Sequence, residues 1–214
     1  MTVTQPVRSL FIASIGNPGR YRNTRHSAGH LLLDAITPLL QRTLPPYSIY
    51  KIWQSPSLMN DSGKKLVKEL ESFARASIPP TNTSIAANSA ESSALTLVIL
   101  HDELEKPLGK VVVKRGGPEA FSLRGHNGLK NIFECLQKKK LYTAIPDAAN
   151  ALSVLRIGVG IGRPESRSPD DVAKYVLTQM GERELDAVKR AAPFAADVLV
   201  EELGRTQSVG SAMR

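Results

Sequence analysis

Cysteine and long apolar runs are the features most nearly missing from this chain of 214 residues. Cys135 is the single cysteine, so the chain cannot form an internal disulfide, and a reducing compartment suits it. No stretch has the apolar length of a membrane span, and the opening MTVTQPVRSLFIASIG resembles neither a signal peptide nor an Arg-rich presequence. We therefore expect an intracellular protein without a membrane partner, in the cytoplasm or, as the alternative, in the mitochondrial matrix.

Histidine is also scarce, with four in the chain, yet His26 and His30 lie within one short stretch, SIGNPGRYRNTRHSAGH. Their spacing would place both rings on one face of a helix and permits a metal-binding pair. However, the glutamate of a His-Glu-x-x-His motif is missing, and the sequence has no other His-x-x-x-His pair and no pair of cysteines. A metal-dependent hydrolase is therefore a minor alternative, and we expect neither a metal nor another cofactor.

Positive charge, by contrast, is in excess. The chain has 28 Lys and Arg against 20 Asp and Glu, a formal net charge of +8, which favours binding to nucleic acid, phosphate or an anionic surface. The length fits one domain over 1–214, large enough to form a full core without disulfides. Within that domain the polar segment PPTNTSIAANSAESS predicts a mobile loop inserted at 79–93.

Apolar periodicity predicts strands that alternate with helices. Short apolar runs bounded by turn residues predict strands at 8–16, 48–53, 94–100, 110–115 and 153–162. Three- and four-residue spacing predicts helices at 28–41, bent or interrupted by Pro38, at 62–76 with Ser62 as cap, at 128–140 and at 182–202. This order implies an α/β fold with a twisted, mostly parallel mixed sheet, helices on both faces, and a ligand site at the strand ends.

Several polar residues fall where such a site would form. His26 follows the Gly-Asn-Pro-Gly turn at the start of a helix, where the helix dipole favours a neutral ring that can accept a proton from water. Asp102 directly follows the apolar run LTLVIL, where it could either orient a histidine or cap a turn. SPSLMNDSG offers Asn60 as a ligand group, unless Asn60, Asp61 or Ser62 simply caps the helix. RGHNGLKN offers His126 and Asn127, and there Asn127 could instead be the helix cap.

Five segments, in this order, resemble the bacterial-type peptidyl-tRNA hydrolase family: GNPGRYRNTRHSAG, LMNDSGK, HDELEKPLG, GHNGLKNI and LRIGVGIGRP. The resemblance implies hydrolysis of the ester between a peptide and the 3′-terminal ribose of tRNA, which releases tRNA for reuse in translation. Four departures from the family pattern, together with the insertion at 79–93, suggest a eukaryotic, fungal branch. In one of them the gap between the Gly-Asn-Pro-Gly turn and the histidine is one residue shorter than in the family. Ser27 stands where the family has Asn, Leu58 where it has an aromatic residue, and RGGPEAFSLRGHNG replaces a shorter Gly-rich approach.

The resemblance also implies roles for particular residues. His26 would be the general base that activates water, and Asp102 would hold its ring in the required tautomer. The expected substrate-binding residues are Asn17 and Asn60 at the peptide backbone, Asn127 near the scissile carbonyl or the water, and Tyr21, Leu58 and Met59 as apolar walls.

The same resemblance predicts how tRNA is held. Lys114 and Arg156 would clamp a phosphate of the acceptor stem, with Lys130 and Arg163 as helpers. We expect a monomer whose partner is peptidyl-tRNA. The main alternative within the same fold is an RNA-binding relative that has lost catalysis, although the implied catalytic and amide residues are intact.

Overall fold

A computed structural model describes residues 8–77, 95–123, 125–142 and 152–205; the loop expected at 79–93 lies outside them. Five strands form one sheet in the order β2-β1-β3-β5-β4. Their bounds are Ser9–Ser14 (β1), Tyr50–Gln54 (β2), Leu95–Glu103 (β3), Val111–Arg115 (β4) and Ser153–Gly160 (β5). All neighbours pair in parallel except β4, which runs antiparallel to β5 at the edge. The mostly parallel mixed sheet is confirmed.

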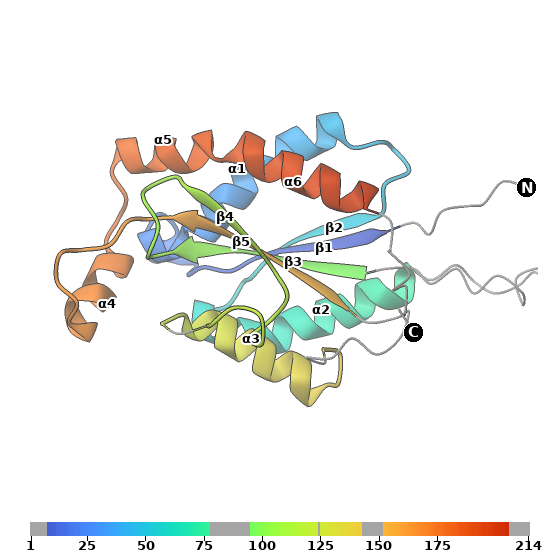
Figure 1. Cartoon of the computed structure of the whole chain (residues 1–214), viewed down its shortest axis with the longest axis horizontal. Helices are drawn as coiled ribbons and strands as arrows, with labels where there is room; N and C mark the ends of the chain where they lie inside the picture. The colour runs from blue at the N-terminus through green and yellow to red at the C-terminus, as the bar shows by residue number, and fades with distance from the viewer. Residues whose placement is uncertain (1–7, 78–94, 124, 143–151, 206–214) are drawn as a thin grey trace, which may run out of the picture.

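Helices cover both faces of this sheet, as expected (Figure 1). The helices on one face are α1 (Ala28–Thr43), α5 (Glu182–Arg190) and α6 (Ala192–Gly204), and those on the other are α2 (Ser62–Ala76) and α3 (Asn127–Lys138). Side chains of β1 alternate between the two layers: Leu10 and Ile12 join the α1 layer, whereas Phe11 and Ala13 join the α2 layer. Because β1 is buried on both faces, its sequence reads as a continuous apolar run.

Two prolines act differently from the sequence prediction. The expected interruption at Pro38 is wrong, because α1 runs through it to Thr43. Burial of Ile36 and Leu40 on either side offsets the backbone hydrogen bond that proline cannot donate. The single helix predicted at 182–202 is also wrong, because α5 ends at Arg190 and α6 begins at Ala192. Pro193, in the first turn of α6, has no N–H to continue the α5 ladder.

Two further corrections concern helix starts. Ser62 is the first residue of α2 and not its cap; its hydroxyl lies 2.8 Å from that of Ser55, so it ties α2 to the end of β2. The sequence analysis also missed α4 (Pro169–Leu177). Its start signal was present, since Ser168 accepts a hydrogen bond from the N–H of Asp171 and Pro169 occupies the first helical position.

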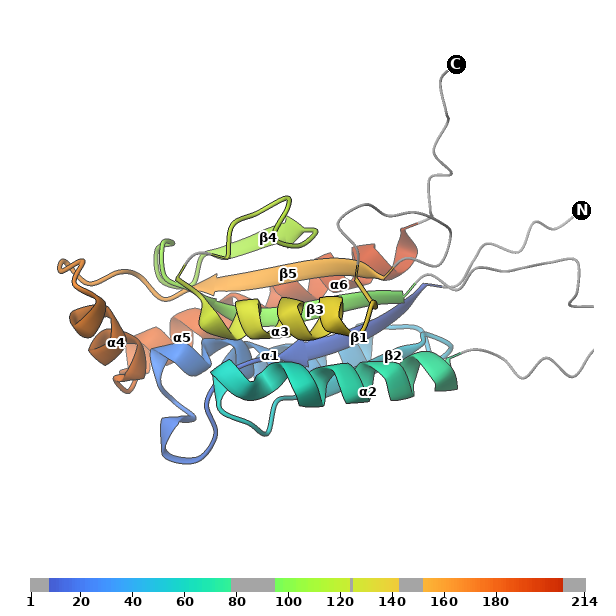
Figure 2. The same cartoon turned by 90° about the horizontal axis from the view of Figure 1, so that it is seen from below.

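The carboxyl ends of the parallel strands meet at one end of the molecule, and α4 lies beyond them (Figure 2). β3 continues past the expected end at Leu100 to Glu103, so Asp102 is fixed by pairing with Val159 of β5. The fold therefore delivers the turn after β1, the end of β3 and the start of α3 to one place. Among the described residues, no helix is both long and apolar enough to cross a membrane.

Candidate active site

The turn after β1 is held closed by Ser27. Its hydroxyl accepts a hydrogen bond from the N–H of Asn17 at 2.9 Å and donates to the carbonyl oxygen of Tyr21 at 2.8 Å. This hydroxyl is fully buried and sits where the family pattern has an asparagine. One small side chain at the departure from the family pattern therefore ties the start of α1 to two positions of the turn, Asn17 and Tyr21.

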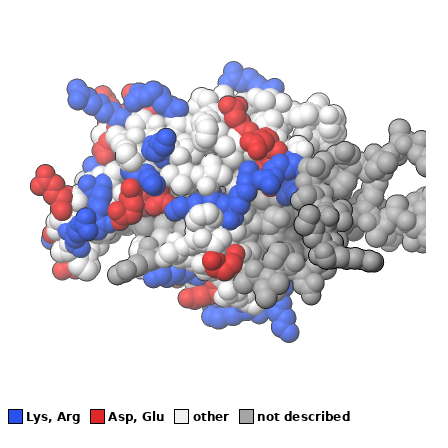
Figure 3. Space-filling view, in the orientation of Figure 1, with Lys and Arg blue, Asp and Glu red and all other residues white. Residues whose placement is uncertain are grey.

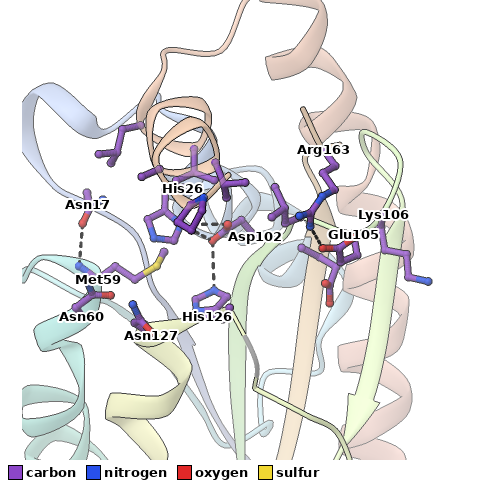
Figure 4. Close-up of a pocket in the computed structure, with 18 of the residues that line it drawn as sticks. Asn17, His26, Met59, Asn60, Asp102, Glu105, Lys106, His126, Asn127 and Arg163 are labelled. Carbon is purple, nitrogen blue, oxygen red and sulfur yellow. Dashed lines mark hydrogen bonds and ion pairs between the residues drawn. The ribbon is translucent and has the colours of Figure 1, made fainter. Parts of the chain in front are cut away.

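His26 lies in a short 3₁₀ turn, Arg25–Ser27, immediately before α1. Its Nδ1 lies 3.1 Å from both carboxylate oxygens of Asp102, to which it donates (Figure 4). With the proton on Nδ1, the Nε2 lone pair is left for the adjoining cavity, which His26 lines. This arrangement can hold a neutral ring with its basic nitrogen toward a ligand.

The electrostatics differ from the neutral-ring expectation based on the helix dipole. Burial lowers the pKa of His26, but the charge and the hydrogen bond of Asp102 outweigh it, so the pKa lies above 6.5. For the Asp102 carboxyl, which is 4% exposed, burial has the opposite effect and by itself would raise the pKa. His26 and His126 nevertheless hold that pKa well below its usual range. Asp102 is therefore a fixed negative charge within β3, and neither a helix cap nor a turn cap.

Although the cap considered for the start of α3 was Asn127, His126 completes the group. Its Nδ1 does cap α3, accepting a hydrogen bond from the N–H of Leu129, while its Nε2 lies 3.3 Å from Asp102 Oδ1 (Figure 4). The expected alternative cap, Asn127, is the first residue of α3 instead. Only the pairing of Gly-His-Asn-Gly with a helix start hinted at this ring.

Arg25 is a second residue that the sequence analysis missed. Its guanidinium donates to both carboxylate oxygens of Glu184, at 2.7 and 3.0 Å, and stacks over the ring of Tyr175. These partners lie on α5 and α4, so the residue beside His26 is anchored to the C-terminal helices. Nothing in the local sequence identifies this pair, because its members are 159 residues apart.

A cavity of about 1360 Å³ opens in front of His26. The expected substrate-binding residues all line it: Asn17, Tyr21, Leu58, Met59, Asn60 and Asn127. Asn17 is partly committed, because its Oδ1 accepts a hydrogen bond from the N–H of Met59 at 2.8 Å, which leaves its amide N–H groups for a ligand (Figure 4). Val172 and Val176 of α4 supply an apolar wall that the sequence analysis did not foresee.

Of the two residues predicted to clamp a phosphate, one is buried and the other lines the cavity. Arg156 is 1% exposed; its guanidinium donates to the carbonyl oxygen of Phe121, whose segment covers it. Lys114, its cross-strand partner, does line the cavity and donates to Glu103 at 2.6 Å. Burial of Arg156 follows from its place in the middle of β5, on the face that α3 and the segment before it cover.

The two basic residues predicted to help hold the phosphate are exposed, but they are not grouped. Lys130 lies on the surface in the first turn of α3, and Arg163 lines the cavity while paired with Glu105. Figure 3 shows Lys and Arg side chains next to Asp and Glu across this face, so the net charge of +8 does not form one unbroken basic patch here.

His30 takes no part in the site. Its ring is fully buried, with Nδ1 2.8 Å from the hydroxyl of Ser14 and the ring edge against Gly16, and burial lowers its pKa to about 4. His26 and His30 therefore do not face one ligand. In the part of the chain that the structure describes, no group of three or more His, Cys, Asp or Glu side chains could hold a metal ion.

Comparisons of the sequence with a family model and with known proteins identify one family. The family model described as peptidyl-tRNA hydrolase matches residues 11–214. A probable peptidyl-tRNA hydrolase of Schizosaccharomyces pombe is 34% identical over 182 residues, which cover 83% of this chain and 75% of the relative. A peptidyl-tRNA hydrolase of Solidesulfovibrio magneticus is 33% identical, with 88% and 84% covered. The crystal structure of the Acinetobacter baumannii peptidyl-tRNA hydrolase is similar in fold, with a TM-score of 0.50, 20% identity and 95% of each chain covered.

Proposed function

The chain belongs to the peptidyl-tRNA hydrolase family and hydrolyses the ester between a peptide and the 3′-terminal ribose of tRNA, and we propose that His26 is the general base of this reaction. The observation that carries the assignment is the contact of His26 Nδ1 with both oxygens of buried Asp102, 3.1 Å away, at the wall of the cavity. Such a pair fixes the tautomer and stabilises the imidazolium that forms during the reaction.

The proposed reaction forms no covalent intermediate with the protein. Nε2 of His26 removes a proton from a water molecule as the water oxygen attacks the ester carbonyl carbon. The tetrahedral intermediate then expels the ribose oxygen, which takes the proton back from the imidazolium. The products are the free peptide acid and tRNA. A positioned water and amide donors toward the developing oxyanion supply the rest of the barrier reduction.

Three asparagines are proposed to hold the peptide part. Asn127, at the start of α3, would donate to the scissile carbonyl or position the water. Asn60 would pair with the peptide backbone, and Asn17 would donate to a peptide carbonyl, since its own oxygen is already bonded to Met59. Tyr21, Leu58 and Met59 are the proposed apolar walls. A free α-ammonium group cannot complete these bonds and is costly to desolvate, which favours N-blocked peptides.

For the tRNA part we propose phosphate contacts by Lys114 and Lys130, with Arg163 as a helper. Lys114 supports this best, because it lies on the cavity wall and is part-exposed. A phosphate at this position would replace Glu103 as its partner. Arg156 is left out, since its burial gives a phosphate no access.

We further propose a monomer that acts in the cytoplasm. The reduced state expected for Cys135 supports the compartment. Light scattering of the purified protein and imaging of the tagged chain would test the two statements separately.

The decisive experiment compares N-acetyl-aminoacyl-tRNA with the unblocked aminoacyl-tRNA and follows ester release from both. We expect rapid release from the blocked substrate and slow release from the unblocked one. Binding without release would identify an RNA-binding relative that has lost catalysis. Loss of release after exhaustive chelation, restored by a divalent metal, would identify a metal-dependent hydrolase.

A further inference from the structure

We propose that His126 is a positioning residue of the reaction, which holds the carboxylate of Asp102 in the orientation that His26 requires. The inference rests on the proposed function and deepens it. The buried carboxylate of Asp102 lies between two histidine rings. Nδ1 of His26 is 3.1 Å from both carboxylate oxygens, and Nε2 of His126 is 3.3 Å from Oδ1.

The hydrogen bond at the start of α3 decides which nitrogen of His126 carries the proton. Nδ1 accepts from the N–H of Leu129 at 3.2 Å, and a nitrogen that accepts carries no proton. The proton of the ring is therefore on Nε2, which lies 3.3 Å from Oδ1 of Asp102. The helix start thus presents a neutral donor to the carboxylate, in the way that a second partner orients a catalytic group.

The packing around His126 keeps the ring in this position. Its side chain is largely buried, and the ring of His101 meets it edge-on with 5.1 Å between the centroids. The Nδ1 of His101 lies 2.7 Å from the carbonyl oxygen of Asp102, and burial lowers the pKa of His101 to about 3. His101 is therefore a neutral spacer between the strand and the helix start.

Few other charges act on this group. Asp102 of β3 is the charged group whose field reaches His26. Arg25, in the same turn, is paired with Glu184 of α5, and α4 contributes the apolar Val172 and Val176 to the cavity wall. On the far side of His101, the buried Arg156 adds a positive charge. The contact between His126 and Asp102 is thus the main control on how strongly the carboxylate acts on His26.

Two consequences follow for His26. A donor at Oδ1 stabilises the carboxylate and weakens its pull on the proton of His26, so losing that donor raises the pKa of His26. Losing it also frees the carboxylate to turn away from the line to Nδ1, which lowers kcat. A helix cap alone would produce neither effect.

The two ring nitrogens of His126 can be replaced separately. In His126→Asn the amide oxygen can replace Nδ1 as the cap of α3, but the side chain is too short to reach Asp102. In His126→Gln the amide N–H can replace Nε2 as the donor, while the cap is lost. The two variants are matched controls, because each keeps the function that the other removes.

We expect His126→Asn to keep the wild-type melting temperature, to lose roughly tenfold in kcat, and to move the acid limb of its rate profile up by about one pH unit. His126→Gln should melt at a lower temperature but keep a kcat and a profile near wild type. An NMR titration of the His26 ring, without substrate, should show the same pKa shift in His126→Asn. A wild-type profile and kcat in His126→Asn would reduce His126 to a helix cap.

The Asp102→Asn background separates this inference from the proposed function. If the inference holds, His126→Asn has no further effect on the profile once Asp102 has lost its charge. An added effect there would show that His126 acts by another route. If instead His26→Ala keeps full turnover, the proposed general base is wrong, whatever His126 does.

Discussion

Two buried carboxylates lie at opposite ends of the sheet, and each is held between nitrogen-bearing side chains. At the carboxyl ends of the parallel strands, Asp102 lies between His26 and His126. At the amino ends, Glu202 of α6 lies between Arg8, at 3.0 Å, and Arg115, at 2.5 Å. The two acids are almost equally buried, with side chains 4% and 5% exposed. Burial of a carboxylate therefore does not distinguish a site from a structural tie.

The partners and the surroundings make the difference. Arginine stays protonated at any pH that the fold survives, so the Glu202 cluster can only tie α6 to the sheet. Thr96 of β3 completes that tie, since its hydroxyl accepts a hydrogen bond from Arg8 at 2.8 Å. Histidine can gain or lose a proton near neutral pH, and the Asp102 group faces a cavity of about 1360 Å³. The Asp102 group can therefore take part in proton transfer, because histidine can change its charge and the group borders an open cavity.

The sharpest test of this contrast removes the titratable partner. His26→Ala should lower kcat by roughly 10³-fold, because general base catalysis is lost. The affinity for uncleaved tRNA should stay near wild type, because the ring is assigned to proton transfer and not to phosphate binding. Single-turnover rates and equilibrium binding measure the two effects. Equal losses in both would contradict the assignment.

Removing the charge from the site carboxylate should have the next largest effect. In Asp102→Asn the amide still holds the ring but no longer stabilises the imidazolium, so kcat should fall by roughly 10²-fold, less than in His26→Ala. The carboxylate is what raises the pKa of His26 against burial, so the acid limb of the profile should move below its wild-type position. Wild-type rates in this variant would leave Asp102 without a catalytic role.

The matched change at the other end should affect stability instead. Glu202→Gln keeps the shape but removes the buried carboxylate that pairs with Arg8 and Arg115, which should cost about 2 kcal/mol, or roughly 30-fold in the folding equilibrium. Because this cluster is remote from the cavity, kcat of the folded enzyme should not change. Denaturant unfolding and steady-state kinetics on the same preparation check both statements. A large loss of kcat in the folded enzyme would break the contrast between the two ends.

The smallest effect concerns the two cross-strand partners Lys114 and Arg156. Lys114→Ala should raise KM for peptidyl-tRNA about fivefold with little change in kcat, since a remote contact contributes uniform binding. It should also flatten the salt dependence of binding by about one unit of slope.

The matched variant Arg156→Met should leave that slope unchanged and lower the melting temperature, because Arg156 is buried under Phe121. A substrate without the acceptor stem is the control, and Lys114→Ala should match wild type on it. Equal damage to both substrates would place Lys114 in the peptide groove or in the fold.

Local sequence predicted most of the secondary structure, because strands and helices here follow from side-chain periodicity. It failed where a distant or covalent constraint intervened. Pro193 splits the last helix through its missing N–H, while burial of Ile36 and Leu40 keeps α1 continuous through Pro38. α4 was missed although Ser168 and Pro169 give a strong start signal, since the helix has nine residues and none of them is fully buried.

For the site, the sequence determined which residue types stand at the strand ends and helix starts, and the resemblance of the five segments to the family then indicated His26, Asp102 and the three asparagines. Only the tertiary structure decided which of them meet. His26 and Asp102 are 76 residues apart, so β3 must pair with β1 and α1 must pack on the sheet before their side chains touch. The segment at Phe121 likewise buries Arg156, which the apolar run around it could not reveal. A local pattern fixes the direction of a side chain, whereas the element that covers it comes from elsewhere in the chain.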